Sequence, residues 1–362
     1  MIARFVLLCV KILRLCVRFF YCKGLDSTTN QMKTQLIDRF NRVHTNLRIS
    51  VTDQCNFRCV YCMPEEMEFI EDEGIMTFDE IVHFARIFVG LGIDKIRITG
   101  GEPLVRRGVA TLIRRLFEIE GLKDISLTTN GIGLVTQAQA LYDAGLRRIN
   151  VSLDTLSEEK FEQITRRKVL SKVLEGLEVA QRCGFNPIKV NAIAMKGFTE
   201  DEILDLTQFA RQNAYQLRFI EFMPLDADDI WGRNMFLPGK EILSRINEVY
   251  PLKQLERNGD AKHAPAKDYQ FVDGKGEVGI IASVSEPFCD DCNRIRLTAD
   301  GQLRTCLFSI TETDLLTLLR AEVADEEIAE HIIEAVKNKE AGHKINATDF
   351  VKPARNMSMI GG

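Results

Sequence analysis

The chain has 362 residues, 45% of them apolar and 27% charged, so it can form a sizeable hydrophobic core and is not dominated by disorder. A net charge of −5 and a pI near 5.7 argue against a dedicated nucleic-acid-binding protein. The length is sufficient for one large domain or two ordinary ones.

The first 31 residues differ in composition from the rest of the chain. They carry a net charge of +4, whereas the remaining 331 residues carry −9. Basic residues recur at helical spacing from Arg4 to Arg18, but no uncharged run is long enough to span a membrane and no clear cleavage site follows. An interfacial helix or an organellar presequence is one interpretation. We favour translation from Met32, because every recognisable motif lies after it.

Short β-branched segments alternate with segments of helical periodicity, which predicts a parallel sheet with right-handed crossovers. The fold class is therefore α/β, an incomplete, TIM-like (β/α)6 barrel. The expected strands cover residues 46–52, 95–99, 125–129, 148–153, 188–194 and 216–222. The expected helices cover residues 77–92, 107–119, 134–144, 157–183 and 200–213.

Polar residues stand at the carboxyl end of every expected strand. Examples are Thr52–Asp53, Gly100–Glu102, Thr128–Asn130 and Ser152–Asp154. In barrels of this type the active site is built at the carboxyl ends of the strands. The sequence therefore predicts one polar catalytic rim.

A second, smaller part is expected after a loop at 225–240. The expected division is an extension outside the fold at 1–31, a barrel domain at 32–240 and an α+β domain at 241–362 that covers the open side of the barrel. Within the last part we expect helices near 240–249, 312–320 and 325–338, strands near 269–272, 278–284 and 294–304, and an aperiodic tail.

Six of the ten cysteines form two triplets, which lie at Cys55, Cys59, Cys62 and at Cys289, Cys292, Cys306. Groups of three are a poor disulfide framework, because each leaves an odd thiol. Three thiolates can instead hold three irons of an iron–sulfur cube and leave the fourth iron open. Zinc is the alternative, above all for the second triplet, although no histidine or fourth cysteine lies nearby to complete a four-ligand site.

The first triplet, in CNFRCVYC, and the later GGEP at 100–103 resemble the radical S-adenosylmethionine enzymes. In that family the open iron chelates the methionine moiety, and one electron from the cluster yields a 5′-deoxyadenosyl radical. The two glycines would allow the backbone to approach the ligand. The resemblance further implies that Glu102 faces the ammonium group.

The resemblance extends over about residues 32–362 to the GTP 3′,8-cyclase family of molybdenum-cofactor synthesis. It implies that the radical removes the ribose 3′ hydrogen of GTP and that C3′ bonds to guanine C8, giving (8S)-3′,8-cyclo-7,8-dihydroguanosine 5′-triphosphate. It also implies two [4Fe–4S] clusters, an open iron in the second cluster that binds the purine, an electron donor such as flavodoxin or ferredoxin, and transfer of the product to cyclic pyranopterin monophosphate synthase. The motifs that carry it are NLRISVTDQCNFRCVYCMP, KIRITGGEPLVRRG, RFIEFMPLD, CNRIRLTADGQLRTCLFS and the terminal GG.

The family resemblance implies a role for each matching position. The two triplets hold the clusters, and S-adenosylmethionine is contacted by Tyr61, Gly101, Ser152 and Met223. GTP is contacted by Arg48, Arg97, Thr128, Lys189, Arg294 and Arg296. The catalytic tail consists of Arg355, Gly361 and Gly362. The residue types agree independently, because a triphosphate needs several cationic donors, and alternate spacing places Arg294 and Arg296 on one strand face.

Two other functions stay open at this point. One is another radical enzyme with an auxiliary cluster, such as a peptide-maturing enzyme, which should lack the GG tail and the pair Arg294 and Arg296. The other is a non-enzymatic metal-binding regulator. We expect no nucleic-acid partner, a monomer or homodimer, and a cytoplasmic location, or an organellar matrix if residues 1–31 are a presequence.

Overall fold

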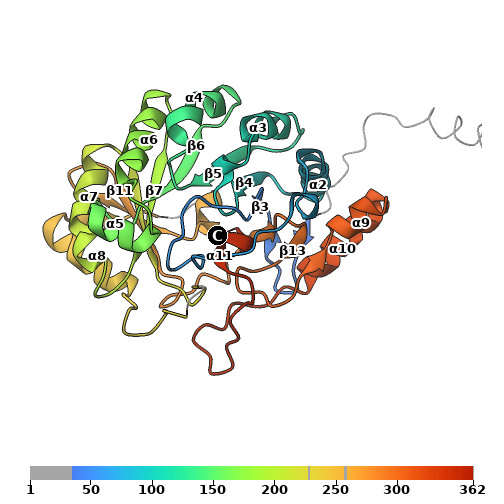
Figure 1. Ribbon diagram of the computed structural model, residues 1–362. Helices are drawn as coiled ribbons and strands as arrows, with labels where there is room; N and C mark the ends of the chain where they lie inside the picture. Colours follow the sequence, from blue (N-terminus) through green and yellow to red (C-terminus); the bar gives the residue numbers. More distant parts are fainter. Residues whose placement is uncertain (1–34, 227–228, 257–258, 362) are drawn as a thin grey trace, which may run out of the picture. The chain divides into compact units, whose positions relative to one another are not determined.

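A twelve-stranded mixed sheet organises the described residues, 35–226, 229–256 and 259–361, of this computed structural model. Its centre contains six parallel strands in chain order, each followed by helical segments on the outer side (Figure 1). They are β3 (Asn46–Ser50), β4 (Lys95–Thr99), β5 (Asp124–Thr129), β6 (Arg148–Ser152), β7 (Ile188–Ala194) and β8 (Gln216–Glu221). All six predicted strands are confirmed within two residues.

The chain after β8 adds strands to both edges of this central sheet. On one edge, β11 (Glu277–Ile281) pairs parallel with β8 and is followed outward by β10 (Lys267–Phe271) and β9 (Leu252–Gln254). On the other edge, β12 (Arg294–Leu297) pairs parallel with β3 and is followed by β13 (Gln302–Arg304) and β14 (Thr313–Asp314). Within the described residues β9 and β14 end the sheet, so the predicted incomplete barrel is confirmed as an open one.

The helices that cover the outer face follow the sequence pattern with one correction. The predicted helix at 157–183 is interrupted, because Arg166 adopts a positive φ of 58° and ends the first segment. A predicted start is confirmed at Thr77, which forms a capping box with Glu80. The outer helices are α2 (Phe78–Gly90), α3 (Val109–Phe117), α4 (Leu134–Asp143), α5 (Glu158–Thr165), α6 (Leu170–Arg182), α7 (Ile203–Gln212) and α8 (Gly239–Val249).

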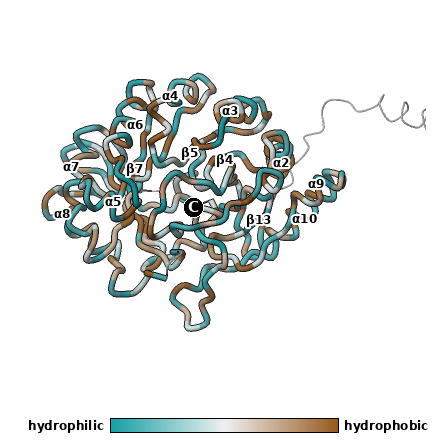
Figure 2. The backbone as a smooth tube through the Cα atoms, in the orientation of Figure 1, coloured by the Kyte–Doolittle hydropathy of each residue, from teal (hydrophilic) through white to brown (hydrophobic). Residues whose placement is uncertain are grey.

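Alternation along the strands separates an apolar outer face from a polar inner face. On β3, Leu47 and Ile49 are fully buried in the core cluster that includes the helices, whereas Arg48 points to the opposite side. On β4, Ile96 and Ile98 repeat the pattern. Both hydrophilic and hydrophobic residues occur on the outer helices (Figure 2), as amphipathic helices require. The inner face is thus available for a polar ligand.

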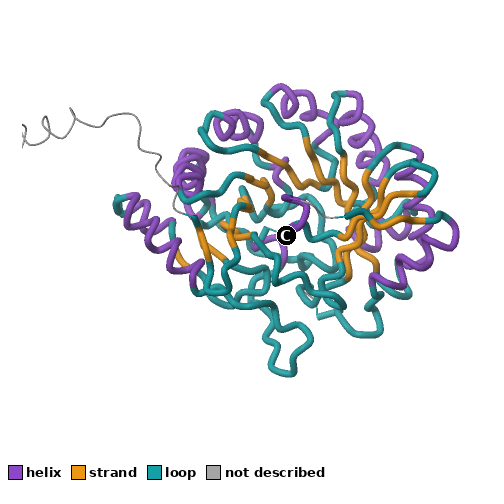
Figure 3. The backbone as a smooth tube through the Cα atoms, turned by 180° about the vertical axis from the view of Figure 1, so that it is seen from behind, coloured by secondary structure: helices purple, strands orange, loops and turns teal. Residues whose placement is uncertain are grey.

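The last described residues lie among the strands. The tail forms a short helix, α11 (Met357–Ile360), and the C-terminus is surrounded by an arc of strands with helices outside it (Figure 3). Four residues are too few to show periodicity, so the sequence analysis missed this helix. It also missed the hairpin of β1 (Leu36–Ile37) and β2 (Val43–His44), whereas α9 (Leu316–Arg320) and α10 (Asp325–Lys337) were expected.

Residues 35–362 cluster as one unit. The proposed domain boundary at 240/241 stays a prediction. The extension at 1–31 and Gly362 lie outside the described residues. Within the part that the structure describes, every helix is too short or too polar to cross a bilayer.

Candidate active site

The first cysteine triplet lies in the loop that leaves the carboxyl end of β3. Its backbone is fixed to the end of α5, because Arg58 N–H donates to Thr165 O and Val60 N–H donates to Ile164 O, each at 3.0 Å. The guanidinium of Arg58 closes the loop by donating to Cys55 O at 2.7 Å. The loop therefore has a defined conformation that the protein itself supplies.

The thiols of this triplet are partly buried, and they are close enough to raise one another's pKa. Burial raises the pKa of Cys55 to about 11 and of Cys62 to about 12, and it raises the pKa of Cys59 as well. The N–H of Phe57 donates to Cys55 Sγ at 3.3 Å, and the N–H of Ser358 lowers the pKa of Cys62. Because iron would supply the missing positive charge, this donor set fits a thiolate-bound cluster.

Gly100 and Gly101 pack against the cysteine loop. A Cβ at Gly100 would overlap the carbonyl oxygen of Thr52, and one at Gly101 would overlap the carbonyls of Asp53 and Gln54. Gly101 N–H donates to Thr52 O at 2.8 Å. The first reason for the two glycines is therefore close approach between two backbone segments, in addition to the expected approach to a ligand.

Glu102 holds the neighbouring strand end. Its buried carboxylate accepts hydrogen bonds from Asn130 N–H at 2.6 Å, Thr129 Oγ1 at 2.7 Å and Leu104 N–H at 3.0 Å. Burial raises its pKa to about 7 despite these bonds. Its oxygens join the loops after β4 and β5, but three bonds leave one of the roughly four acceptor positions of a carboxylate open, so the expectation that it faces a ligand ammonium stays a prediction.

One of the expected S-adenosylmethionine residues, Tyr61, joins the cysteine loop to the end of β6. The Tyr61 hydroxyl donates to Asp154 Oδ2 at 2.6 Å, just beyond Ser152 at the end of β6. Asp154 also accepts from Ile193 N–H at 2.7 Å, and burial raises its pKa to about 6. Met223 follows β8 and packs against a small apolar cluster that includes Met357 of the tail. The structure thus brings three strand ends and the tail toward one loop.

A row of arginines crosses the inner face of three adjacent strands. Arg296 on β12 is the direct partner of Arg48 on β3, which is the partner of Arg97 on β4. Burial and mutual repulsion lower the pKa of Arg48, that of Arg97 to about 9 and that of Arg296 to about 10. Arg97 Nε donates to Ser126 Oγ at 3.2 Å. Such a concentration of buried cations needs an anion to balance it.

Several buried polar atoms on this face have no hydrogen-bond partner among the described residues. They include Arg48 Nε, Arg296 Nε, Ser50 Oγ and Asn191 Oδ1. Buried polar groups in folded proteins are nearly always satisfied, so each such atom requires an explanation. A polar ligand on the inner face supplies one.

Lys189 on β7 continues the cationic surface toward the other side of the barrel. Burial, together with the charges of Arg218 and Arg148, lowers its pKa to about 7. Neither arginine was singled out from the sequence. Each occupies a position on its strand that alternation assigns to the inner face. Applying the alternation to β6 and β8 could therefore have found them. Expected Thr128 lies near this group and accepts from Asn150 Nδ2 at 3.4 Å.

The second cysteine triplet lies at the amino end of β12. Cys292 precedes this strand by two residues, and the β12–β13 hairpin returns the chain to Cys306 at the same end. Burial raises the pKa of Cys292, but the charges of Arg294 and Lys339 outweigh burial and bring it to about 6. Arg294 Nη2 lies 3.4 Å from Cys292 Sγ. A thiolate donor is therefore stabilised here by the protein.

The amino-terminal hairpin supports this second triplet. Arg42 donates to the carbonyls of Cys289 at 2.8 Å and Ala341 at 2.6 Å, while its Nε pairs with buried Asp38 at 2.6 Å. Lys339 Nζ lies 3.6 Å from Cys292 Sγ. Sequence reasoning missed both residues, because their partners lie at distant positions in the chain.

The two triplets stand at opposite ends of the same pair of parallel strands. The first follows the carboxyl end of β3, and the second precedes the amino end of β12, which is its parallel neighbour. A five-residue strand spans roughly 17 Å. Arg48 and Arg296 lie between the two ends, so the cationic row separates the two thiol-rich sites.

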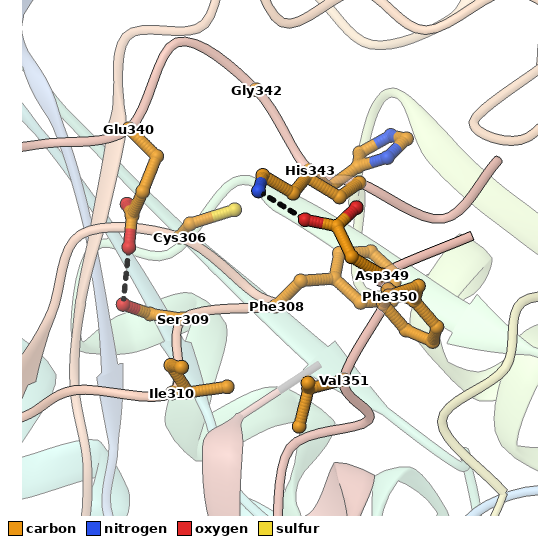
Figure 4. A pocket seen from close by; sticks show the side chains of 11 residues that line it. Cys306, Phe308, Ser309, Ile310, Glu340, Gly342, His343, Asp349, Phe350 and Val351 are labelled. Atoms are coloured by element: carbon orange, nitrogen blue, oxygen red, sulfur yellow. Dashed lines mark hydrogen bonds and ion pairs between the residues drawn. The ribbon is translucent and has the colours of Figure 1, made fainter. Parts of the chain in front are cut away.

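Among residues 35–226, 229–256 and 259–361, no three His, Cys, Asp or Glu side chains converge on one metal ion. In an iron–sulfur cube each thiolate binds a different iron, so the sulfurs need not meet at one point. A cavity of about 190 Å³ opens beside Cys306, with Phe308 and Phe350 on its wall (Figure 4). One lysine, Lys344, lines this cavity, and it is paired with Asp349 at 2.7 Å. The residues expected to bind the triphosphate lie on the strands and not in this cavity.

The tail reaches the carboxyl end of β3. Gly361 has a positive φ of 73°, and a Cβ at this position would overlap Ser50 Oγ and lie 3.1 Å from Thr99 Cγ2. This fit explains a glycine at position 361. Gly362 lies outside the described residues. Arg355 is turned instead to Asp300 and Glu312.

Comparisons with known proteins agree with both halves of this arrangement. Residues 49–210 match the Radical SAM superfamily, and residues 215–345 match the family Molybdenum Cofactor Synthesis C. The solved structure of Streptococcus suis SuiB bound to S-adenosylmethionine has a TM-score of 0.57 at 12% identity, covering 88% of this chain and 76% of that chain. At this identity the similarity shows the fold alone.

The fold and the three-cysteine loop at the end of β3 define a radical S-adenosylmethionine enzyme. Proteins named GTP 3′,8-cyclase from Rhodopirellula baltica and Streptomyces coelicolor are each 47% identical to this chain. Each match covers 90% of this chain, and 92% and 96% of the respective relative. The chain belongs to the GTP 3′,8-cyclase family, which confirms the resemblance found in the sequence. Its cofactors are those of that family, S-adenosylmethionine and iron–sulfur clusters.

Proposed function

We propose that each cysteine triplet holds one [4Fe–4S] cluster and that GTP binds between them, on the inner face of β12, β3 and β4. The carrying observation is the row of Arg48, Arg97 and Arg296 between the two triplets, in which Arg48 and Arg296 each have a buried Nε without a partner among the described residues. As a member of its family, the enzyme acts in molybdenum-cofactor biosynthesis. The proposed positions of the clusters and of GTP assign parts of this activity to particular residues.

When bound, the first cluster and S-adenosylmethionine supply the radical that removes hydrogen from the ribose. The chain's own residues bind and orient the reactants. Arg48, Arg97 and Lys189 offer charge-assisted donors to phosphate oxygens, and Thr128 offers a hydroxyl. Because these donors lie on strands rather than on flexible loops, they hold the ribose in a fixed position relative to the first triplet.

The first triplet has the S-adenosylmethionine residues around it. Gly101 lies against the cysteine loop, and Ser152 and Met223 occupy the ends of β6 and β8. The hydroxyl of Tyr61 is engaged with Asp154, so the tyrosine contributes its backbone and ring. Glu102 keeps the adjacent loops together, and its remaining acceptor position is the proposed partner of the ammonium group of S-adenosylmethionine.

At the second triplet, Cys289, Cys292 and Cys306 leave one iron of the proposed cluster without a protein ligand. The purine of GTP is the proposed occupant of that iron. Arg294, beside Cys292, and Arg296, two residues further along β12, then extend from this end toward the phosphates. At the opposite end, where Gly361 lies against Ser50 at the carboxyl end of β3, the terminal Gly361–Gly362 pair is the proposed catalytic tail.

We further propose an electron donor such as flavodoxin or ferredoxin, and transfer of the product to cyclic pyranopterin monophosphate synthase. We assign the enzyme to the cytoplasm, as a monomer or homodimer without a nucleic-acid partner. The peptide-maturing alternative shares the fold, but the curated relatives at 47% identity carry the GTP 3′,8-cyclase name. The regulator alternative is overturned by family membership.

The test is iron and sulfide counting on anaerobically purified protein, together with a product assay on GTP. Two cubes predict about eight irons and about eight sulfides per chain. The cyclised nucleotide should form in proportion to the 5′-deoxyadenosine released. Protein that carries zinc without sulfide, or that binds GTP equally well after both Arg48 and Arg296 are replaced, would overturn the proposal.

A further inference from the structure

Arg355 is held by two carboxylates. Its Nη1 and Nη2 donate to the two oxygens of Asp300 at 3.1 and 2.8 Å, and its Nε donates to Glu312 at 3.0 Å. The side chains of Arg355, Asp300 and Glu312 are 19%, 22% and 20% exposed. All three nitrogens of the guanidinium are therefore engaged by carboxylates, in a largely desolvated network.

Both carboxylates lie next to strands at the sheet edge that includes β12, the strand of Arg296. Asp300 lies in the turn between β12 and β13, and Glu312 immediately precedes β14. Glu312 also accepts from Arg304 on β13, whose cross-strand partner is Arg296 on β12. The network thus joins the tail to the rigid edge of the sheet that presents Arg296.

The residues after Arg355 make uncharged contacts, among them the hydrogen bond from Ser358 N–H to Cys62. Asn356 and Ser358 approach the sulfur of Met67 at 3.6 and 3.9 Å, and Ile360 is buried. Gly361 then lies against Ser50. Along the described tail, Arg355 is thus the last residue with an ion pair before the glycines.

We propose that Arg355 is a positioning residue that fastens the tail to the β12–β14 edge and so places Gly361 beside GTP. This inference rests on the proposed GTP site and revises the expectation that Arg355 is catalytic. Bidentate pairing fixes the orientation of a guanidinium as well as its position. Five residues separate Arg355 from Gly361, so a fixed starting point restricts where the glycines can lie.

The test compares Arg355→Ala, deletion of Gly361–Gly362 and the combination of both in the full-length enzyme. The readout is cyclised GTP per 5′-deoxyadenosine released. We expect Arg355→Ala to lower this ratio about tenfold, the effect of losing a charge-assisted anchor. The combined variant should be no worse than the deletion alone, because Arg355 acts only through the tail. Multiplied losses would show an independent role and overturn the inference.

A second readout separates positioning from a general folding defect. Hydrogen exchange at residues 356–360 should accelerate in Arg355→Ala, while exchange in β3 to β8 and the iron content stay unchanged. Asp300→Asn should lower the ratio in the same way, and Arg355→Lys should restore part of it. Unchanged exchange in the tail of Arg355→Ala would overturn the inference.

Arg320→Ala is the matched control. Arg320, in the C-terminal part of the chain, also makes a bidentate pair, with Glu80 at 2.7 and 3.2 Å. It is remote from the tail in sequence. Its loss should leave the ratio unchanged. If the wild-type enzyme forms no cyclised product, the proposed function fails. If the glycine deletion lowers the ratio but the Arg355 variants keep the wild-type ratio, the positioning role fails and the proposed function stands.

Discussion

Arg296 on β12 and Arg48 on β3 are direct cross-strand partners, and each has a buried Nε without a hydrogen-bond partner among the described residues. Like charges placed opposite each other destabilise a sheet, and burial adds to the cost. The arrangement is favourable only when an anion is bound. We therefore expect GTP to stabilise the fold as well as to occupy the site.

Replacing Arg296 with alanine should weaken GTP binding about tenfold or more. A charge-assisted hydrogen bond contributes about 1.5–3 kcal/mol, and 1.4 kcal/mol corresponds to a factor of ten. Isothermal titration of GTP into the anaerobic protein measures the dissociation constant. Arg115→Ala, which removes an exposed pair with Asp79, is the control. Equal dissociation constants for the Arg48, Arg294 and Arg296 variants and the wild type would defeat the assignment.

GTP affinity should fall as pH rises above about 7, through deprotonation of Lys189. Burial and the charges of Arg218 and Arg148 lower its pKa to about 7, so the free protein loses this proton at mildly alkaline pH. Bound phosphate favours the charged form, so binding takes up a proton above that pKa. The dissociation constant should rise by up to about tenfold per pH unit.

This pH dependence is measured between about pH 7 and 8.5, below the pKa values of about 9 and 10 for Arg97 and Arg296. Lys189→Met removes the titrating group and should flatten the profile. Lys189→Arg should flatten it as well but keep tighter binding, because a guanidinium stays protonated. A profile in Lys189→Met as steep as the wild type would assign the pH dependence to another group.

The two cysteine triplets should be separable by their products. Cys59→Ala should abolish release of 5′-deoxyadenosine, because the first site loses a ligand. Cys292→Ala should spare at least some release but stop cyclisation, because the second site lies at the opposite end of β3 and β12. Chromatography of both products from the same reaction makes the comparison. Loss of 5′-deoxyadenosine to the same extent in both variants would contradict independent sites.

Gly361→Ala should reduce cyclisation while cleavage of S-adenosylmethionine persists. A Cβ at this position overlaps Ser50 Oγ, and the φ of 73° strains any residue other than glycine. Deletion of both terminal glycines, or Gly362→Ala, should act in the same direction. The measurement is again product per 5′-deoxyadenosine, with iron content as the folding control. A wild-type ratio in all three variants would mean that the tail end has no role in the reaction.

A chain that begins at Met32 should be fully active and at least as soluble as the full-length protein. It retains β1, which starts at Leu36 and pairs with β2, and all the motifs that follow. The omitted residues are apolar and basic. Activity and sedimentation of the two chains, expressed side by side, provide the test. Loss of folding on truncation would show that the extension is integral.

The sequence by itself determined the six central strands, the α/β class and both cysteine triplets. Alternation such as KIRIT at 95–99 specifies a strand with one polar face, because successive side chains point to opposite sides. Cysteine spacing is likewise a local property of the chain. The break in the predicted helix at 157–183 was not foreseen, because a single residue, Arg166, in a left-handed conformation has no periodic signature.

Only the tertiary structure decided what the residues do together. Arg42 and Cys289, or Arg355 and Asp300, meet across long stretches of chain, and no spacing rule predicts such contacts. Glu102 and Arg355 illustrate the same point: both side chains look free in the sequence, yet each is hydrogen-bonded to neighbours from distant parts of the chain. The two triplets lie at opposite strand ends because β12 pairs with β3. This pairing joins residues about 250 positions apart in the chain through hydrogen bonds of the sheet.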